Sequence, residues 1–562
     1  MVKKILTFLN REFHGVNEAA VLLGGFAFLS QLLGLVRDRA LAHTVGAGPL
    51  LDVYYAAFRV PDFLYISIGS LASITVLLPF LVEKLNGGAD DTVRARTFMN
   101  SIFSAYMMCM VGISIIVALC MPFLASYIAP GFSATDKALL VDVSRIMLLS
   151  PIFIGLSNLI GTITQLFRRF FVFSLSPVFY NLGILAGIVF LYPSYGVHGL
   201  ALGVVIGAFL HVAIQIPVII EHGFFPKFVL RINWKEVKDV VRLSLPRTLA
   251  LSANSFAFII LIAMASTLVP GSISLFTFAY NLQSVPVGII GISYSVAAFP
   301  ILVKSFSMKD MDNFIGHIIS AARQIIFWSL PVLALLMVLR AQIVRVILGS
   351  NTFSWADTRL TAASIALFVI SLVSQGLVLL FVRGYYAAGN TKKPLFVNIF
   401  SSVMVVVFAK LFLFIFARYP HVLSVLENVL RVKDVPGTLM LALPLAYACG
   451  SLVNFFLIWG LFKKDFSHKA TRELWVTFYQ SAIGALVMGM TAYLALGILD
   501  NVFTLSTFRG IFLQGFISGL IGISVGIFTL SLMKNRELAD ITRVLHAKFW
   551  RSRIIAPEQG EL

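Results

Sequence analysis

The sequence predicts an all-α polytopic membrane protein. Of its 562 residues, 59% are hydrophobic and only 12% are charged, and the mean hydropathy is +0.93. A soluble chain carries roughly twice this charged fraction. Apolar runs such as 103–129 and 513–533 reach the ~20 residues that cross a bilayer as a helix. Because the chain shows no alternation of period two, a transmembrane β-barrel is disfavoured.

Hydropathy and turn signals predict fourteen transmembrane helices. The segment before the first of them, 1–18, is interrupted by polar residues and has no small-residue cleavage site after it. We therefore expect an amphipathic N-terminal segment at the membrane surface and no cleaved signal peptide. The expected spans are 19–45, 50–83, 97–124, 138–164, 171–193, 197–220, 243–268, 272–303, 312–339, 358–388, 394–417, 437–462, 472–498 and 508–533.

The positions of Lys and Arg orient these spans. Most of the 43 Lys and Arg residues fall in every second loop, beginning with the N-terminus and including 222–242 and the tail after the last span. Positive loops face the cytoplasm, and one helix more or fewer would destroy the alternation. Both termini are therefore predicted to be cytoplasmic, with 130–137 and 419–436 outside. The net charge of +18 then faces anionic lipid headgroups, so no nucleic-acid partner is predicted.

The chain also contains an internal repeat. The segment AAFRVPDFLYISIGSLASITVLLPFLVEKL, from Ala56, resembles FAYNLQSVPVGIIGISYSVAAFPILVKSF, from Phe278. A second pair is SPVFYN, which ends at Asn181, and KPLFVN, which ends at Asn398. An offset of six spans restores orientation, so two six-helix lobes related by pseudo-two-fold symmetry are predicted around a central cavity, as in many transporters.

This repeat sets the expected division of the chain. The predicted parts are an amphipathic N-terminal segment (1–18), an N-lobe of six helices (19–221), a cytoplasmic inter-lobe loop (222–242), a C-lobe of six helices (243–463), the two extra C-terminal helices (464–534) and a basic cytoplasmic tail (535–562).

Three consecutive charges, Arg37, Asp38 and Arg39, interrupt the first span. Either they lie at a helix end and snorkel to the headgroups, or they line a water-filled cavity, because a charge at the bilayer centre costs on the order of 3 kcal/mol. The apolar segment continues beyond them, which favours the cavity for Arg37 and Asp38, whereas Arg39 projects elsewhere and is expected to snorkel. At steps of three or four, Ser30 and Gly34 fall on one stripe of the helix with Arg37, and Gln31 and Gly34 fall on the adjacent stripe with Asp38.

Other polar groups stand in later spans. Asp52 and Arg59 lie near the start of the second span, and the repeat places Arg59 opposite Asn281 across the cavity. The planar fork of donors on an arginine suits phosphate or pyrophosphate. Arg323 and Lys410 are expected either to snorkel or to pair.

Signatures of enzymes are missing. The chain has no P-loop, G-x-S-x-G or H-E-x-x-H motif and no paired Cys/His set. We therefore predict no catalytic residue, metal ligand or cofactor. Cys109, Cys120 and Cys449 lie in apolar segments and are expected to be packing residues.

Five stretches carry a resemblance to a known family. They are LSQLLGLVRDRALAHTVGAGPLLDVYYAAFRVPDFL (29–64), APGF (129–132), FSLSPVFYN (173–181), PVGIIGISYSVAAFPILVKSF (286–306) and GYYAAGNTKKP (384–394). They resemble the MurJ/MviN family, within the multidrug/oligosaccharidyl-lipid/polysaccharide exporter superfamily.

The resemblance implies a function in cell wall biosynthesis. It implies that the chain flips lipid II, the undecaprenyl-pyrophosphate-linked peptidoglycan precursor, to the outer leaflet of the bacterial plasma (inner) membrane by alternating access. It also implies that 464–534 form a groove for the lipid tail. The expected partners are lipid II or a related polyprenyl-pyrophosphate glycolipid, membrane lipids and the cell-wall synthesis machinery. Whether the membrane potential or a monovalent ion is coupled to transport is not readable from the sequence.

Individual residues match this family in part. Arg37 and Asp38 match its helix 1 pair, Asp52 its helix 2 aspartate, and Arg59 stands where the family carries a basic residue. Gln31, Tyr65 and Asn281 stand where the family has arginines, and Ser70-Leu71 replaces its Glu-Gly. These matches make Arg37, Asp38, Asp52 and Arg59 the candidate headgroup ligands. The candidate cavity-lining residues are Ser30, Gln31, Gly34, Tyr65 and Asn281.

Two alternatives remain open. The chain could export another polyprenyl-linked glycan or an amphiphile, which would tolerate fewer arginines. It could also be a non-transporting scaffold for envelope assembly that kept the fold, although the retained Arg37, Asp52 and Arg59 argue against this.

Overall fold

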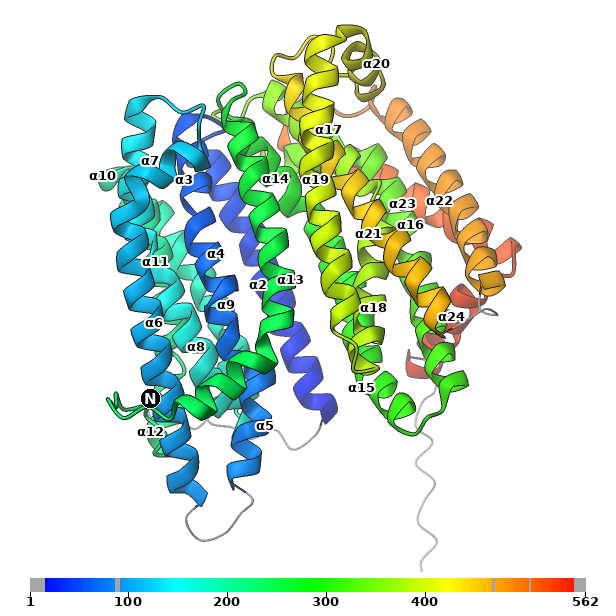
Figure 1. The fold of residues 1–562 in the computed structure, drawn as a ribbon. Coiled ribbons are helices and arrows are strands. Elements are labelled where there is room, and N and C mark those ends of the chain that lie inside the picture. The colour runs from blue at the N-terminus through cyan, green and yellow to red at the C-terminus, as the bar shows by residue number, and fades with distance from the viewer. Residues whose placement is uncertain (1–15, 86–90, 467–470, 505–506, 550–562) are drawn as a thin grey trace, which may run out of the picture. The chain divides into compact units, whose positions relative to one another are not determined.

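The computed structural model describes residues 16–85, 91–466, 471–504 and 507–549. The described residues form helices joined by short turns, with no β-strand among them (Figure 1). The fold class is therefore confirmed as all-α. Of the predicted N-terminal segment 1–18, all but the last three residues lie outside the described part of the chain.

Long apolar helices cover most of the predicted spans. Within the described ranges, eleven helices are long and apolar enough to cross a membrane, and a bent pair raises this to twelve. The pair consists of α17 (Trp355–Val369) and α18 (Leu372–Ala387), which meet at 46°. The predicted spans 19–45 and 50–83 are helical but are not among the twelve, so the count of fourteen is not confirmed.

The bounds of the other helices are as follows. The N-terminal half contains α2 (Val16–Thr44), α3 (Pro49–Ala57), α4 (Arg59–Ser67), α5 (Ile74–Leu85), α6 (Asp91–Ile128), α7 (Ala134–Met147), α8 (Leu149–Leu166), α9 (Phe170–Ala186), α10 (Tyr192–Tyr195), α11 (Val197–Ala213), α12 (Ile216–Glu221) and α13 (Trp234–Ser266). The C-terminal half contains α14 (Ser272–Pro286), α15 (Ser293–Ser307), α16 (Met311–Leu348), α19 (Lys392–Arg418), α20 (Pro420–Leu430), α21 (Ala442–Phe466), α22 (Thr471–Leu499), α23 (Phe508–Leu532) and α24 (Arg536–Phe549).

The second span is broken, although the sequence predicted one helix over 50–83. It consists of α3, α4, a 3-10 turn at Gly69–Ala72 and α5, with Ser73 in an extended conformation before α5. The break follows from local sequence, because Gly69 and the serines beside it hold a helix poorly. An added Cβ at Gly69 would come 2.8 Å from Cδ2 of Tyr65, so the turn also packs tightly.

The repeat-related span is irregular at nearly the corresponding place. Between α14 and α15 the backbone forms a π-helical segment, Val287–Ile292, directly after Pro286. Interrupted helices at matching positions of two repeats are a pointer to a transport site, and π-helical segments often occur at functional sites.

The described chain packs into two compact units. The first comprises residues up to Val285 together with Val344–Phe368 and Gly389–Leu457, and the second comprises Pro286–Ile343, Val369–Ala388 and the segment from Ile458 onward. These units are defined by packing and not by symmetry. They therefore leave the predicted division into lobes at 221 and 243 untested.

Close packing of glycines holds α9 against α11 in the first unit. Gly183 faces Gly207, and Gly187 faces Gly203, such that an added Cβ at Gly183 would lie 2.3 Å from the Gly207 Cα. Small residues that let backbones approach are typical of helix contacts in membranes.

In the first unit, the turn between α6 and α7 and the helix α20 lie at one end, and α12 lies at the other (Figure 1). This arrangement agrees with the predicted alternation of loops.

Polar contacts tie α24 to the second unit. Glu537, which is 2% exposed, accepts bonds from Arg323 Nε at 2.7 Å and from Thr477 Oγ1 at 2.9 Å. Asn535 donates to Gln480 Oε1 at 2.9 Å and accepts from the backbone N–H of Leu538. Of the two alternatives predicted for Arg323, the structure shows pairing. The tail predicted for 535–562 thus begins as a helix anchored to α16 and α22.

Candidate functional site

Arg37 and Asp38 form an ion pair within α2. Arg37 donates from Nε at 3.0 Å and from Nη2 at 2.8 Å, both to Oδ1 of Asp38. The Asp38 side chain is 2% exposed and that of Arg37 is 23% exposed. Consecutive residues on a helix do not normally face each other, so the long arginine side chain curls back to reach its neighbour. The pairing offsets the cost of two charges in an apolar helix.

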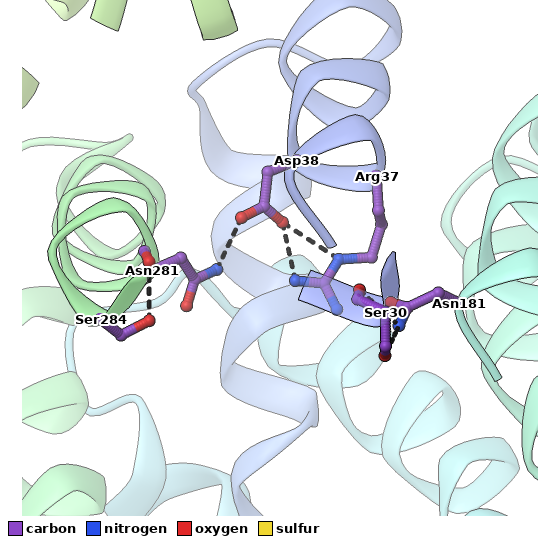
Figure 2. A network of polar contacts seen from close by, with 6 residues as sticks. All are labelled: Ser30, Arg37, Asp38, Asn181, Asn281 and Ser284. Atoms are coloured by element: carbon purple, nitrogen blue, oxygen red, sulfur yellow. Dashed lines mark hydrogen bonds and ion pairs between the residues drawn. The ribbon is translucent and has the colours of Figure 1, made fainter. Parts of the chain in front are cut away.

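Asn281 of α14 completes the network on the other side of Asp38. Its Nδ2 donates to Oδ2 of Asp38 at 2.9 Å, and Ser284 Oγ donates to the Asn281 backbone carbonyl at 2.7 Å. Figure 2 shows the Asp38 carboxylate between Arg37 and Asn281. The structure therefore brings together three of the residues singled out from the sequence, and Asp38 links α2 to α14.

The polar stripe before Arg37 divides into bonded and open positions. Asn181 of α9 donates to the Ser30 hydroxyl at 3.1 Å and to the Ser30 carbonyl at 3.3 Å (Figure 2). An added Cβ at Gly34 would meet no atom within 4 Å, and Gln31 is half-buried. Ser30 thus fastens α2 to α9, and Gly34 borders open space one turn before Arg37.

Arg39 does not snorkel, contrary to the prediction. Its Nη1 donates to the carbonyls of Val346 at 2.5 Å and Ile347 at 3.1 Å, at the C-terminal end of α16. The last carbonyls of a helix lack intrahelical partners and attract cations. Arg39 is therefore a capping residue that fixes the end of α2 to the end of α16, which hydropathy alone does not reveal.

The side chain of Asp52, a residue of α3, lies against the start of α14 and shows no bond to Arg37. The side chain is 3% exposed and accepts from the backbone N–H groups of Gly271 at 2.7 Å and Ser274 at 2.8 Å, and from Ser274 Oγ at 2.5 Å. Free N–H groups at a helix N-terminus favour such a carboxylate. In this conformation Asp52 ties α3 to α14, and its assignment to the headgroup stays a prediction.

Arg59 lies over an aromatic ring. The guanidinium carbon is 4.7 Å from the centre of the Phe258 ring, and Nε donates to the Tyr55 carbonyl at 3.2 Å. The Phe258 ring in turn meets that of Tyr280, the neighbour of Asn281, at 4.8 Å. The ring fixes the plane of the guanidinium, and the two Nη groups have no hydrogen-bond partner among the described residues.

Tyr65 has a polar partner of its own. Asn158 Nδ2 of α8 donates to the Tyr65 hydroxyl at 2.7 Å. The tyrosine is half-buried, and it is therefore positioned by α8 and not held by a charged group.

Two residues of this region were missed in the sequence. The Tyr55 hydroxyl is buried without a hydrogen-bond partner in the described part of the chain. It interacts electrostatically with Asp38, Arg37 and Arg59. Asp62 is exposed on α4, and the charges of Arg59 and Arg37 both act on its carboxylate. The spacing of Arg59 and Asp62, three residues apart on one helix, was the signal that could have revealed the acid.

Charged side chains gathered among helices of which most are long and apolar enough to cross a membrane indicate a multi-pass membrane transport protein. The family model described as "Lipid II flippase MurJ" matches residues 41–513. Because that match covers most of the sequence, the chain belongs to the lipid II flippase MurJ family.

Individual relatives agree with the family match. The chain is 26% identical over 490 residues to a probable lipid II flippase MurJ of Haemophilus influenzae, with 83% of this chain and 90% of the relative covered. It is 23% identical over 532 residues to the corresponding protein of Vibrio cholerae, with 90% and 96% covered. These relatives are bacterial, and the family places the chain in a bacterial inner membrane.

Solved structures show the same fold. A structure titled "Lipid II flippase MurJ, inward closed conformation" matches with a TM-score of 0.73 and 22% identity, covering 92% of this chain and all of that one. An inward-facing multidrug resistance transporter of the MATE family matches with a TM-score of 0.62 and 15% identity, covering 82% and 98%. At these identities the likeness shows the fold alone.

Proposed function

We propose that this chain flips lipid II from the cytoplasmic to the outer leaflet for cell wall biosynthesis. The observation that carries the proposal is that two arginines, Arg37 of α2 and Arg59 of α4, keep guanidinium donors without a partner among the described residues. Arg37 uses Nε and Nη2 on Asp38, and its Nη1 group has no partner among the described residues. Arg59 likewise keeps two Nη groups for a ligand. Guanidinium donors in a low-dielectric setting are suited to pyrophosphate oxygens.

Asp38 has a positioning role in this proposal. It holds Arg37 in a fixed orientation and balances its charge while the site has no anion. When the pyrophosphate arrives, the unused donors of Arg37 bind it, and Asp38 keeps the guanidinium from turning toward solvent. Fixing the donors before the ligand arrives lowers the ordering cost of binding.

The contacts to α14 suit a gate for alternating access. Asp52 binds the N-terminus of α14, and Asp38 binds Asn281, about two turns after Ser274 on the same helix. Separation of α14 from α2 and α3 would break these few polar bonds, each of which contributes a net ~0.5–3 kcal/mol. Together these bonds are strong enough to hold α14 against α2 and α3 in one conformation, and weak enough to break during transport.

The remaining predictions belong to the same proposal. Both termini face the cytoplasm, the lipid tail lies along 464–534, and the driving force is the membrane potential or a monovalent ion gradient, with no cofactor. An association with the cell-wall synthesis machinery follows from the family resemblance.

A second substrate class is supported by three positions. Gln31, Tyr65 and Asn281 are neutral. The Tyr65 hydroxyl accepts from Asn158, and the Asn281 amide donates to Asp38. A site with fewer cations suits a less charged headgroup, such as a polyprenyl-linked glycan that carries one phosphate.

Native mass spectrometry of the purified chain decides between these substrates. Lipid II and a monophosphate-linked glycolipid of equal tail length would be offered together. We expect lipid II to be retained preferentially, and the preference to fall for Arg37→Ala. The control is Lys410→Ala, because this exposed residue of α19 has no polar partner in the described part. Preference for the monophosphate would favour the second substrate class.

A further inference from the structure

Asp62 is a charged residue that the proposed function does not use. It lies in α4, within the predicted span 50–83, and is exposed. Its carboxylate has no hydrogen bond or ion pair among the described residues. An ionisable group in such a segment is costly against lipid and marks a functional position.

The surroundings of Asp62 are polar. The Asp62 carboxylate interacts electrostatically with Arg59 and Arg37. It also interacts electrostatically with Tyr180 of α9 and with Tyr65 of its own helix. From α13, Arg247 acts on Tyr65. Asp62 also lies three residues after Arg59 on α4, so the two side chains share one face of the helix beside the arginine site.

Four charged residues of this site balance one another without a substrate. Arg37 and Arg59 carry two positive charges, and Asp38 and Asp62 carry two negative ones. Asp38 is bonded to Arg37 and Asn281, whereas Asp62 is unbonded. A pyrophosphate diester brings two negative charges, which Asp62 repels across a region of low dielectric.

We propose that Asp62 binds a proton when the anionic headgroup enters and releases it when the headgroup leaves. The inference rests on the proposed function. The proton comes from water in the cavity and adds to the free carboxylate, so no other bond forms or breaks. Proton binding removes the repulsion, and by linkage the two ligands favour each other.

Asp62 is the group of this site that suits such a role. Tyrosine and arginine titrate far above neutrality, and the Asp38 carboxylate is already bonded to Arg37 and Asn281. His211 of α11, with its ring 6.3 Å from that of Tyr180, is a second titratable group nearby. A substitution at 62 is therefore needed to separate an effect of Asp62 on the pH dependence of binding from an effect of His211.

Lipid II affinity of the purified full chain in nanodiscs, measured between about pH 5.5 and 8, tests the inference. Wild-type affinity should fall as pH rises, by up to about tenfold per pH unit for one proton. Asp62→Asn should bind equally at all pH values and as tightly as wild type at low pH. Glu83→Gln, which changes an exposed acid at the end of α5, should behave as wild type.

Calorimetry of the wild type covers the case in which Asp62→Asn fails to fold. Binding heats in buffers of different ionisation enthalpy report the protons taken up, and we expect up to one per lipid. Zero uptake, or an unchanged pH dependence in a folded Asp62→Asn, would overturn the inference and leave the proposed function standing. Absence of lipid II binding at every pH would overturn both.

Discussion

At the scale of the residue, the pair Arg37–Asp38 explains how a charge triplet is tolerated inside an apolar helix. Asp38 is almost fully buried and accepts from both Arg37 and Asn281, whereas Arg39 leaves the pair and caps α16. The sequence predicted the first two residues as a polar face of the helix. It could not predict the partner of Arg39, because that contact joins residues about three hundred positions apart.

Removal of Arg37 should weaken headgroup binding. Each charge-assisted bond contributes roughly 1.5–3 kcal/mol, so Arg37→Ala should lower lipid II affinity by roughly 10- to 100-fold. Arg37→Lys should recover only part of the loss, since an ammonium lacks the planar fork. Binding measured by native mass spectrometry checks this order, and full recovery by lysine would show that only the charge matters.

Arg39→Ala should instead affect stability. The carbonyls of Val346 and Ile347 lose their donor, so the melting temperature should fall while lipid II affinity is retained. Thermal unfolding in detergent, followed beside the binding assay, separates the two effects. A loss of affinity without a loss of stability would place Arg39 in the site and contradict its role as a cap.

At the scale of the element, hydropathy predicted where helices lie but not where they break. The span 50–83 was predicted as one helix because its apolar length suffices, yet Gly69 and Ser73 interrupt it. Glycine and serine there were visible in the sequence, but membrane helices tolerate both, so a break could not be inferred. The π-helical segment after Pro286 escaped prediction for the same reason, since it leaves the apolar pattern unchanged.

Packing of α9 on α11 gives a test at this scale. Gly183→Ala would push a Cβ to within 2.3 Å of the Gly207 backbone, which forces the helices apart. We expect a destabilisation of about 1–3 kcal/mol, the usual cost of overpacking. Gly112→Ala is the matched control, because its Cβ would meet nothing within 4 Å and should be neutral or stabilising. Equal melting temperatures for both variants would show that the close approach is not needed.

At the scale of the whole molecule, composition and the placement of Lys and Arg predicted a multi-pass helical protein with alternating loops. The candidate site was predicted in part: Arg37, Asp38 and Asn281 meet, whereas Asp62 and Tyr55 went unnoticed. The spacing of Arg59 and Asp62 on one helix could have revealed Asp62, whereas Tyr55 and Asp62 both also interact with Arg37 of another helix, which a single sequence does not show.

The orientation in the membrane is tested by labelling. Single cysteines at Ser133 and Arg231, in a background without Cys109, Cys120 and Cys449, would be exposed to an impermeant thiol reagent in intact cells. The positive-inside rule predicts labelling at 133 and none at 231 until the membrane is opened. The reverse pattern would invert the topology and place the charged loops outside.

The central claim is that the unused donors of Arg37 and Arg59 carry a pyrophosphate lipid across the membrane. Its most direct test is the amount of lipid II exposed on the outer face of a bacterial strain depleted of its own flippase and supplied with this chain. The account predicts exposure and growth with the wild type, and neither with Arg37→Ala/Arg59→Ala at equal amounts in the membrane. Exposure sustained by the double variant, or absent with a well-produced wild type, would contradict it.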